Sequence, residues 1–383
     1  MNRLLPLLIV AMSCQSYQFE PVEPVTITID DRIIPLNPVL KPNVMLTVDR
    51  SGSMGAKIDA ACQGALCATR MGDLKQAVST FTALADAQVR LGLTAFPRDP
   101  TTQAGAEASC LPASSVTVPL PVTSRSDDAQ ADQANRTNAM QVNAAVQALN
   151  PAGGTPTGAT LAFLGAHAGL VANDFRNDFV LLLTDGLPNC NAENPNDFVQ
   201  NAAVCRCQTG GGDCSGLDVR RRGCLDADAT VREVEQLAAK GIRTIVVGFG
   251  ADTSQPDARE VLERLAKAGG VPRACSADAQ CGAGNSCVNA ECSRWSFQAG
   301  NRAELEQVLS TVLTGLAPAM CLLDLPQKPL NSGAVSLLVG DKVVTRGPDT
   351  WQLVSGDRQI QLAPAFCETN QGTVLRLRVA GSP

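Results

Sequence analysis

Short apolar runs alternate with longer amphipathic segments from residue 43 to residue 316. The apolar runs have the length of buried strands, which we expect at Val44–Val48, Val89–Phe96, Phe179–Leu183, Ile242–Val247 and Trp295–Gln298. The amphipathic segments predict helices at Asp73–Ala87, Asn138–Leu149, Thr157–Val171, Asp226–Lys240, Pro256–Ala268 and Arg302–Leu313. This alternation predicts an α/β fold with a doubly wound, mostly parallel sheet.

The two ends of the chain have a different pattern. Residues 14–42 are punctuated by proline, with β-like runs at Val25–Ile29 and Ile33–Ile34, and we interpret them as a tether leading into edge strands. Residues 317–383 predict a small β unit with strands at Val335–Val339, Lys342–Val344, Gln359–Leu362 and Val374–Val379. Ser115–Leu120 also alternates and is a candidate hairpin partner for the strand that ends at Phe96.

The first 13 residues have the pattern of a targeting segment. A positive start at Asn2-Arg3 precedes an apolar stretch, Leu4–Met12, that is too short to span a bilayer. Ala11-Met12-Ser13-Cys14 resembles the bacterial lipobox, which implies cleavage before Cys14 and acylation of that cysteine. The alternative is an ordinary signal peptide that leaves Cys14 as a thiol. A lipid on Cys14 would anchor the chain to a membrane.

The charge of the chain argues against nucleic acid as a partner. The net charge is −6, and the one basic run, Arg220-Arg221-Arg222, is better explained as a solvated loop than as a polyanion site. A hydrophobic content of 45% with both signs of charge interspersed indicates a globular chain. No phosphate-binding glycine loop followed by lysine is present, and His167 is the single histidine, so we expect no enzyme.

Cysteines concentrate in four predicted insertions, at residues 54–70, 97–114, 186–225 and 271–294. Assigning Cys14 to the lipid leaves 14 of the 15 cysteines, enough for seven disulfides in an oxidising compartment. The disulfide candidates are Cys62, Cys67, Cys110, Cys190, Cys205, Cys207, Cys214, Cys224, Cys275, Cys281, Cys287, Cys292, Cys321 and Cys367. The four in residues 271–294 could instead form a zinc knot, but their spacing lacks the short pairs that zinc favours.

Topology predicts where these insertions lie. Loops that follow parallel strands meet at the carboxyl edge of the sheet, where ligands bind. We therefore expect the insertions at 54–70, 97–114 and 186–225 on that edge. The insertion at 271–294 precedes the last strand and should lie at the opposite edge, together with the N-terminal tether and the C-terminal β unit.

Three oxygen-rich stretches stand at strand ends or turns: Asp49-x-Ser51-x-Ser53, Gly153-Gly154-Thr155 and Thr184-Asp185-Gly186. In this order and separation they resemble the von Willebrand factor A (vWA) domain and its metal-ion-dependent adhesion site. The resemblance covers residues 43–316 and implies a divalent cation, Mg²⁺, Mn²⁺ or Ca²⁺. It implies that Ser51, Ser53 and Thr155 coordinate through hydroxyls, and Asp49 and Asp185 directly or through water. An acidic group of a partner would fill the open position.

The whole arrangement resembles the cysteine-rich gliding-motility adhesin lipoproteins of myxobacteria. The residues that carry this resemblance are Cys14–Pro21, Lys41–Leu46 and Asp49-x-Ser51-Gly52-Ser53. It implies a lipid-anchored outer-membrane protein at the cell surface, with the extracellular substratum or an acidic protein as ligand and outer-membrane motility proteins as partners. The alternatives are a periplasm-facing scaffold that binds a partner protein through the same edge, and a chelatase-type subunit.

Overall fold

A parallel sheet forms the centre of the molecule. The computed structural model describes residues 27–35, 40–64, 66–85, 88–99, 106–122, 127, 129–171, 176–206, 216–319, 321–325, 327–354, 357–370 and 373–381. In sheet order the strands are β3 (Arg90–Phe96), β2 (Asn43–Asp49), β4 (Asp178–Thr184), β5 (Ile242–Phe249) and β8 (Phe297–Ala299). β2 and β5 are buried at every position because helices cover both faces. The predicted α/β class is confirmed.

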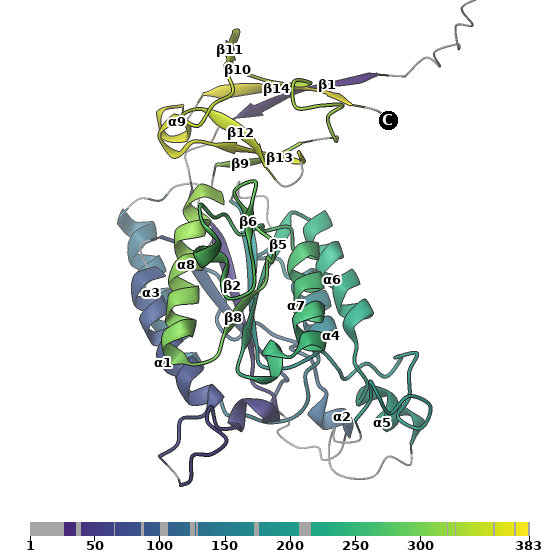
Figure 1. Cartoon of the computed structure of the whole chain (residues 1–383). Helices are drawn as coiled ribbons and strands as arrows, with labels where there is room; N and C mark the ends of the chain where they lie inside the picture. The colour runs from purple at the N-terminus through teal and green to yellow at the C-terminus, as the bar shows by residue number, and fades with distance from the viewer. Residues whose placement is uncertain are drawn as a thin grey trace, which may run out of the picture.

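Helices cover the two faces of this sheet (Figure 1). One face packs against α1 (Arg70–Ala85), α3 (Ala129–Gln147) and α8 (Arg302–Ala319). The other packs against α4 (Thr157–Leu164), α6 (Ala227–Ala239) and α7 (Pro256–Ala268). α7 has the predicted bounds, since proline starts it and Gly269 follows it. In the described part of the chain, none of the helices is long and apolar enough to cross a bilayer.

Three predicted elements are wrong in part. The helix expected at Asn138–Leu149 is α3, which begins nine residues earlier, at Ala129. The helix from Thr157 ends at Leu164 instead of Val171, since the N–H groups of Ala166 and His167 donate to carbonyls only three residues earlier. Gly165 follows its last residue and lies against α6, where a Cβ would lie 3.3 Å from Leu237. The Lys240 ammonium donates to the Gly165 carbonyl at 2.7 Å, which satisfies this helix end. Ser115–Leu120 is no hairpin strand, since it forms a single antiparallel bridge, Leu93 to Val118.

The C-terminal residues form a β unit with its own core, packed at one end of the sheet (Figure 1). One of its two sheets has the order β1 (Thr28–Pro35), β14 (Val374–Gly381), β10 (Val335–Val339) and β11 (Lys342–Val344). The other has the order β12 (Trp351–Val354), β13 (Gln359–Leu362) and β9 (Leu322–Asp324). A short helix, α9 (Pro364–Thr369), follows β13, and the Cys321–Cys367 disulfide joins α9 to the start of β9.

The N-terminal strand therefore belongs to the β unit and not to the parallel sheet. β1 lies at the edge of its sheet, as predicted, but pairs antiparallel with β14 from Thr28–Gly381 to Pro35–Val374. The sequence did not predict β9, β12 or α9, which are too short for a clear hydrophobic period.

The insertions lie as the topology predicted. The loop with the Cys62–Cys67 disulfide, α2 (Ala106–Ser109) and α5 (Leu217–Arg222) lie at the end of the sheet opposite the β unit (Figure 1). The disulfides Cys110–Cys190 and Cys205–Cys224 close the loops there. In the insertion at 271–294, Cys275–Cys287 and Cys281–Cys292 are disulfides around the hairpin β6 (Cys287–Val288) and β7 (Glu291–Cys292). Disulfide sulfurs are not thiolates, so the zinc alternative is wrong.

Candidate metal centre

The loop after β2 brings three predicted ligands together. β2 ends at Asp49, whose side chain is fully buried. The Ser51 backbone N–H donates to Asp49 Oδ1 at 2.8 Å, which folds the loop back over the carboxylate. A short 3-10 turn, η1 (Gly52–Gly55), follows and leaves Ser53 exposed. Ser51 Oγ and Ser53 Oγ lie 2.9 Å apart, so the two hydroxyls already share one side of the loop.

Asp185 and Thr155 reach the same point from two other segments. Asp185 follows β4, and its Oδ1 accepts a hydrogen bond from Ser53 Oγ at 2.8 Å. Thr155 precedes α4; a Cβ on Gly186 would lie 3.9 Å from Thr155 Oγ1 and 3.8 Å from Ser53 Oγ. The threonine and serine hydroxyls thus approach the same small residue. All five predicted ligands therefore lie around one position at the carboxyl edge of the sheet.

The Thr155 loop is held from both sides by neighbouring insertions. The Thr155 N–H donates to Asn189 Oδ1 at 2.8 Å, and the Asn189 N–H donates back to the Thr155 carbonyl at 3.0 Å. The Gly154 N–H donates to the Ser109 carbonyl at 2.8 Å. Gly153 has a φ of +78°, and a Cβ on it would lie 2.6 Å from the Ser109 carbonyl oxygen. A glycine is therefore required here.

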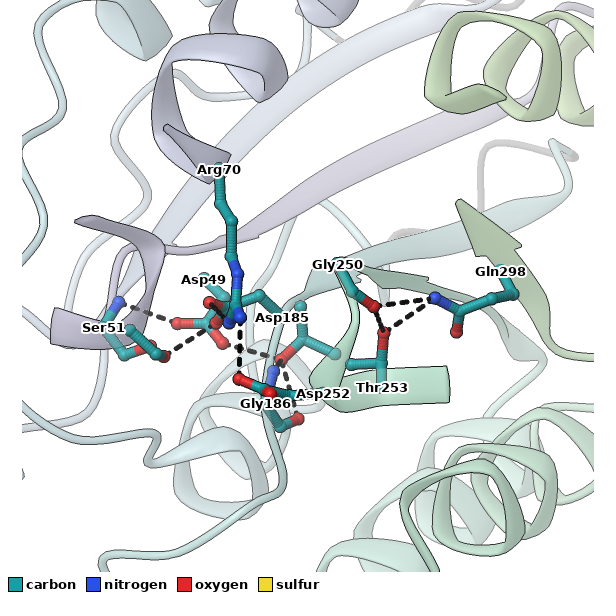
Figure 2. A network of polar contacts seen from close by, with 11 residues as sticks. Asp49, Ser51, Arg70, Asp185, Gly186, Gly250, Asp252, Thr253 and Gln298 are labelled. Atoms are coloured by element: carbon teal, nitrogen blue, oxygen red, sulfur yellow. Dashed lines mark hydrogen bonds and ion pairs between the residues drawn. The ribbon is translucent and has the colours of Figure 1, made fainter. Parts of the chain in front are cut away.

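The sequence analysis missed Arg70, Asp252 and Thr184. Figure 2 shows the Arg70 guanidinium between two carboxylates: it donates to Asp185 Oδ2 at 2.8 Å and to Asp252 Oδ2 at 2.7 Å. Gly250 makes room for this side chain, since a Cβ on it would lie 2.9 Å from Arg70 Nε. Thr184 Oγ1 donates to Asp49 Oδ2 at 2.6 Å. Thr184 directly precedes Asp185 and was visible in the motif, whereas no spacing in the sequence pointed to Arg70.

The two aspartates carry more negative charge than their surroundings neutralise. Burial raises the pKa of Asp49 to about 7, and the nearby Asp185 carboxylate adds to this rise, while hydrogen bonds from Thr184 and Ser51 oppose it. Burial also raises the pKa of Asp185, although hydrogen bonds from Arg70 and Ser53 oppose that rise. Arg70 is shared with Asp252, so the single guanidinium faces three carboxylates.

A small divalent cation fits this donor set. The ligands are carboxylate and hydroxyl oxygens, which Mg²⁺, Mn²⁺ and Ca²⁺ prefer. In an octahedron with metal–oxygen distances of about 2.1 Å, neighbouring ligand oxygens lie about 3.0 Å apart. The Ser51–Ser53 and Ser53–Asp185 oxygen pairs are separated by 2.9 Å and 2.8 Å, so little movement is needed. A divalent charge would also offset the uncompensated carboxylate.

Other predicted residues lie elsewhere or outside the described residues. Cys14, Cys207 and Cys214 fall on segments that the structure does not describe. His167 was expected in mid-helix but follows α4 in a turn, where burial lowers its pKa. Arg220-Arg221-Arg222 forms the last turn of α5, so the prediction of a loop is wrong. Arg220 forms a salt bridge to Asp197 at 3.5 Å and Arg222 one to Asp218 at 2.9 Å.

No protein-family model matches the sequence, and no curated protein matches it. Solved structures that resemble the chain include the pilus adhesin SpaC from Lactobacillus rhamnosus GG, with 16% identity, a TM-score of 0.44, and coverage of 92% of this chain and 41% of that one. A von Willebrand factor type A protein from Catenulispora acidiphila has 14% identity and a TM-score of 0.39, covering 94% and 66%. Manganese-loaded TRAP from Plasmodium vivax has 13% identity and a TM-score of 0.38, covering 76% and 78%. The chain thus spans less than half of the pilus adhesin. At identities this low, the likeness concerns the course of the backbone and not the function.

Proposed function

We propose that this chain is a divalent-cation-dependent adhesin without enzymatic activity. Asp49, Ser51, Ser53, Thr155 and Asp185 would hold the ion, as in a metal-ion-dependent adhesion site. The observation that carries the proposal is the convergence of these side chains on one edge of the sheet, where the oxygens of Ser51, Ser53 and Asp185 already have octahedral spacing. Both carboxylates are fully buried below that edge, whereas Ser53 is exposed.

The geometry supports binding of an acidic ligand group. Three of the five donors are neutral hydroxyls, so the ion would keep much of its positive charge. When bound, it supplies a Lewis-acidic position for a carboxylate of the partner. The ligand would reach it on the side of Ser53 and the partly exposed Gly186, since the other donors are buried.

We further propose that the chain is an outer-membrane lipoprotein, anchored through Cys14 and displayed at the cell surface. In this role it would couple outer-membrane gliding-motility proteins to the substratum. The placement of the two ends supports this orientation: β1, the first described strand, lies in the β unit, and the candidate metal centre lies at the far end of the sheet (Figure 1). An anchor before β1 would leave the metal-binding edge pointing outward.

The test combines metal binding with cell attachment. Asp49→Ala and Asp185→Ala should each lower the Mn²⁺ affinity of the purified chain at least about 100-fold, the upper end of what loss of an outer-shell partner costs. Cells with either variant at wild-type surface level should attach and glide only as well as chelator-treated cells. Asp341→Ala, an exposed turn residue of the β unit, is the control and should behave as wild type.

Two results would refute the adhesin. Attachment that survives both aspartate variants would make the metal site structural or idle. Protection of the protein from added protease on intact cells would favour the periplasm-facing scaffold, because an adhesin must be reachable from outside.

A further inference from the structure

A cavity of about 320 Å³ lies beside the candidate metal centre, between α4, α6 and the Cys110–Cys190 disulfide. It shares two walls with that centre. Pro156 follows Thr155 directly, and Asn189 forms two hydrogen bonds with the Thr155 backbone. The cavity therefore borders the loop that carries Thr155, one of the proposed metal ligands.

A buried carboxylate lines the cavity. Asp226, at the start of α6, is 8% exposed, and its Oδ1 accepts a hydrogen bond from Asn191 Nδ2 at 2.8 Å. Among the described residues, no salt bridge reaches Asp226. Its Oδ2 lies against Gly158 of α4, since a Cβ there would approach it to 3.5 Å. Burial raises the pKa of Asp226, although the hydrogen bond from Asn191 and the nearby charge of Arg232 oppose that rise.

The other polar groups of the cavity leave its charge negative. Glu233, two turns along α6, adds a second carboxylate. Arg222 is the single basic residue of the lining, and Asp218 already binds its guanidinium at 2.9 Å. Asn189 and Asn191 contribute amide oxygens. A cationic group that entered the cavity could form a charge-assisted hydrogen bond with Asp226, which has no salt-bridge partner among the described residues.

The size and the walls of the cavity indicate a side-chain-sized guest. Its volume is at the lower end of the range for small-molecule sites. The remaining lining is made of Pro112 and of small residues: Gly158, Ala159 and Ala162 of α4, Ala229 of α6, and Ala192. None of the described lining residues is aromatic, so the cavity has no surface on which a sugar ring would stack.

We propose that this cavity is a second ligand subsite, which binds a lysine or arginine side chain of a protein ligand whose acidic group binds the metal ion. The subsite rests on the proposed metal-dependent function and narrows its ligand class to segments that carry both charges. Asp226 is the residue that selects the cation, and Asn191 holds its carboxylate in position.

The test uses peptides on the full chain with Mn²⁺. The probes are acetyl-Asp-(Gly)n-Arg-amides with no to four glycines, which separate the charged residues by up to about 17 Å. Each has a matched peptide with glutamine in place of arginine. At one spacer length, calorimetry should give at least tenfold tighter binding of the arginine peptide to the wild type. Asp226→Asn should bring that ratio to about one and leave Mn²⁺ affinity unchanged.

The controls separate this proposal from the metal site. Asp228→Asn removes an exposed α6 carboxylate that pairs with Arg264, and should keep the wild-type ratio. Agmatine carries a guanidinium but no carboxylate, and should bind weakly without metal and lose binding in Asp226→Asn. The subsite is refuted if the arginine and glutamine peptides bind with equal affinity at every spacer length. It is also refuted if Asp226→Asn keeps the preference for arginine. If glucosamine binds through Asp226 and agmatine does not, the proposal that the ligand is a protein is refuted. Arginine selectivity through Asp226 without Mn²⁺ dependence would uphold the subsite and refute the metal function.

Discussion

The Cys110–Cys190 disulfide joins the two segments that hold the Thr155 loop. Ser109, next to Cys110, accepts a hydrogen bond from Gly154, and Asn189, next to Cys190, bonds the Thr155 backbone twice. Replacing both cysteines with alanine keeps Ser109 and Asn189 in the sequence but removes the covalent link between their two segments, which could then move independently. We therefore expect the variant to position Thr155 poorly and to bind the cation more weakly.

The size of the effect follows from the loop that the disulfide closes. Its cysteines are 80 residues apart, and the chain-entropy relation assigns about 4.5 kcal/mol of folding free energy to a loop of that length. The effect on the metal is a separate quantity. Asn189 and Ser109 support a ligand without touching the ion, and loss of such support costs about 10- to 100-fold in metal affinity.

Calorimetric titration of the purified variant with Mn²⁺, below its unfolding temperature, measures this loss. The matched control is Cys62→Ala/Cys67→Ala, which opens a disulfide on the same edge of the molecule with a separation of 5 residues and no described contact to the ligands. That change should cost about 2 kcal/mol of stability and leave Mn²⁺ affinity unchanged. Wild-type affinity in the Cys110/Cys190 variant would refute the reasoning. An equal loss in both variants would attribute it to general destabilisation.

Two further predictions concern the same site. Burial raises the pKa of Asp49 to about 7, well above its unfolded value. Its contribution to the stability of the metal-free chain is therefore fully present below about pH 4 and is lost as pH rises through 7. Urea unfolding in the presence of a chelator should show stability falling between about pH 4 and 7, and saturating Mg²⁺ should reverse this fall. A rise in stability over the same pH range without metal would contradict the raised pKa of Asp49. Gly153→Ala places a Cβ 2.6 Å from the Ser109 carbonyl oxygen at a φ of +78°. It should cost about 1–3 kcal/mol in thermal unfolding, whereas Gly55→Ala, whose Cβ would meet only Pro151 at 3.5 Å, should cost less than half of that.

The strands and most helices of the parallel sheet could be predicted because burial on both faces leaves a continuous apolar signal. β2 and β5 are examples, since each is buried throughout. The helix after Thr157 shows the limit. Its sequence stays helix-compatible to Val171, and the packing of Gly165 against Leu237 and the hydrogen bond from Lys240 at its end depend on a segment more than 70 residues away.

The candidate site divides in the same way. Its proposed ligands could be found because each follows a strand or a turn with a recognisable local sequence. Arg70 and Asp252 could not, since Arg70 meets Asp185 and Asp252 across 115 and 182 residues of sequence. The pairing of Cys110 with Cys190 was equally hidden, because 14 cysteines allow many connectivities and only the fold selects one.

The course of the chain from β1 to the Asp49 loop has a mechanical consequence. β1 leads through residues 36–42 into β2, and β2 ends at the proposed metal ligands. A chain held at its N-terminus and pulled at the metal ion would be stretched along β2 itself. β2 is flanked by β3 and β4 in parallel register, from Asn43 to Asp49 and from Asn43 to Val48 respectively. Such a pull would load both ladders of hydrogen bonds lengthwise, so that they resist together instead of opening one at a time.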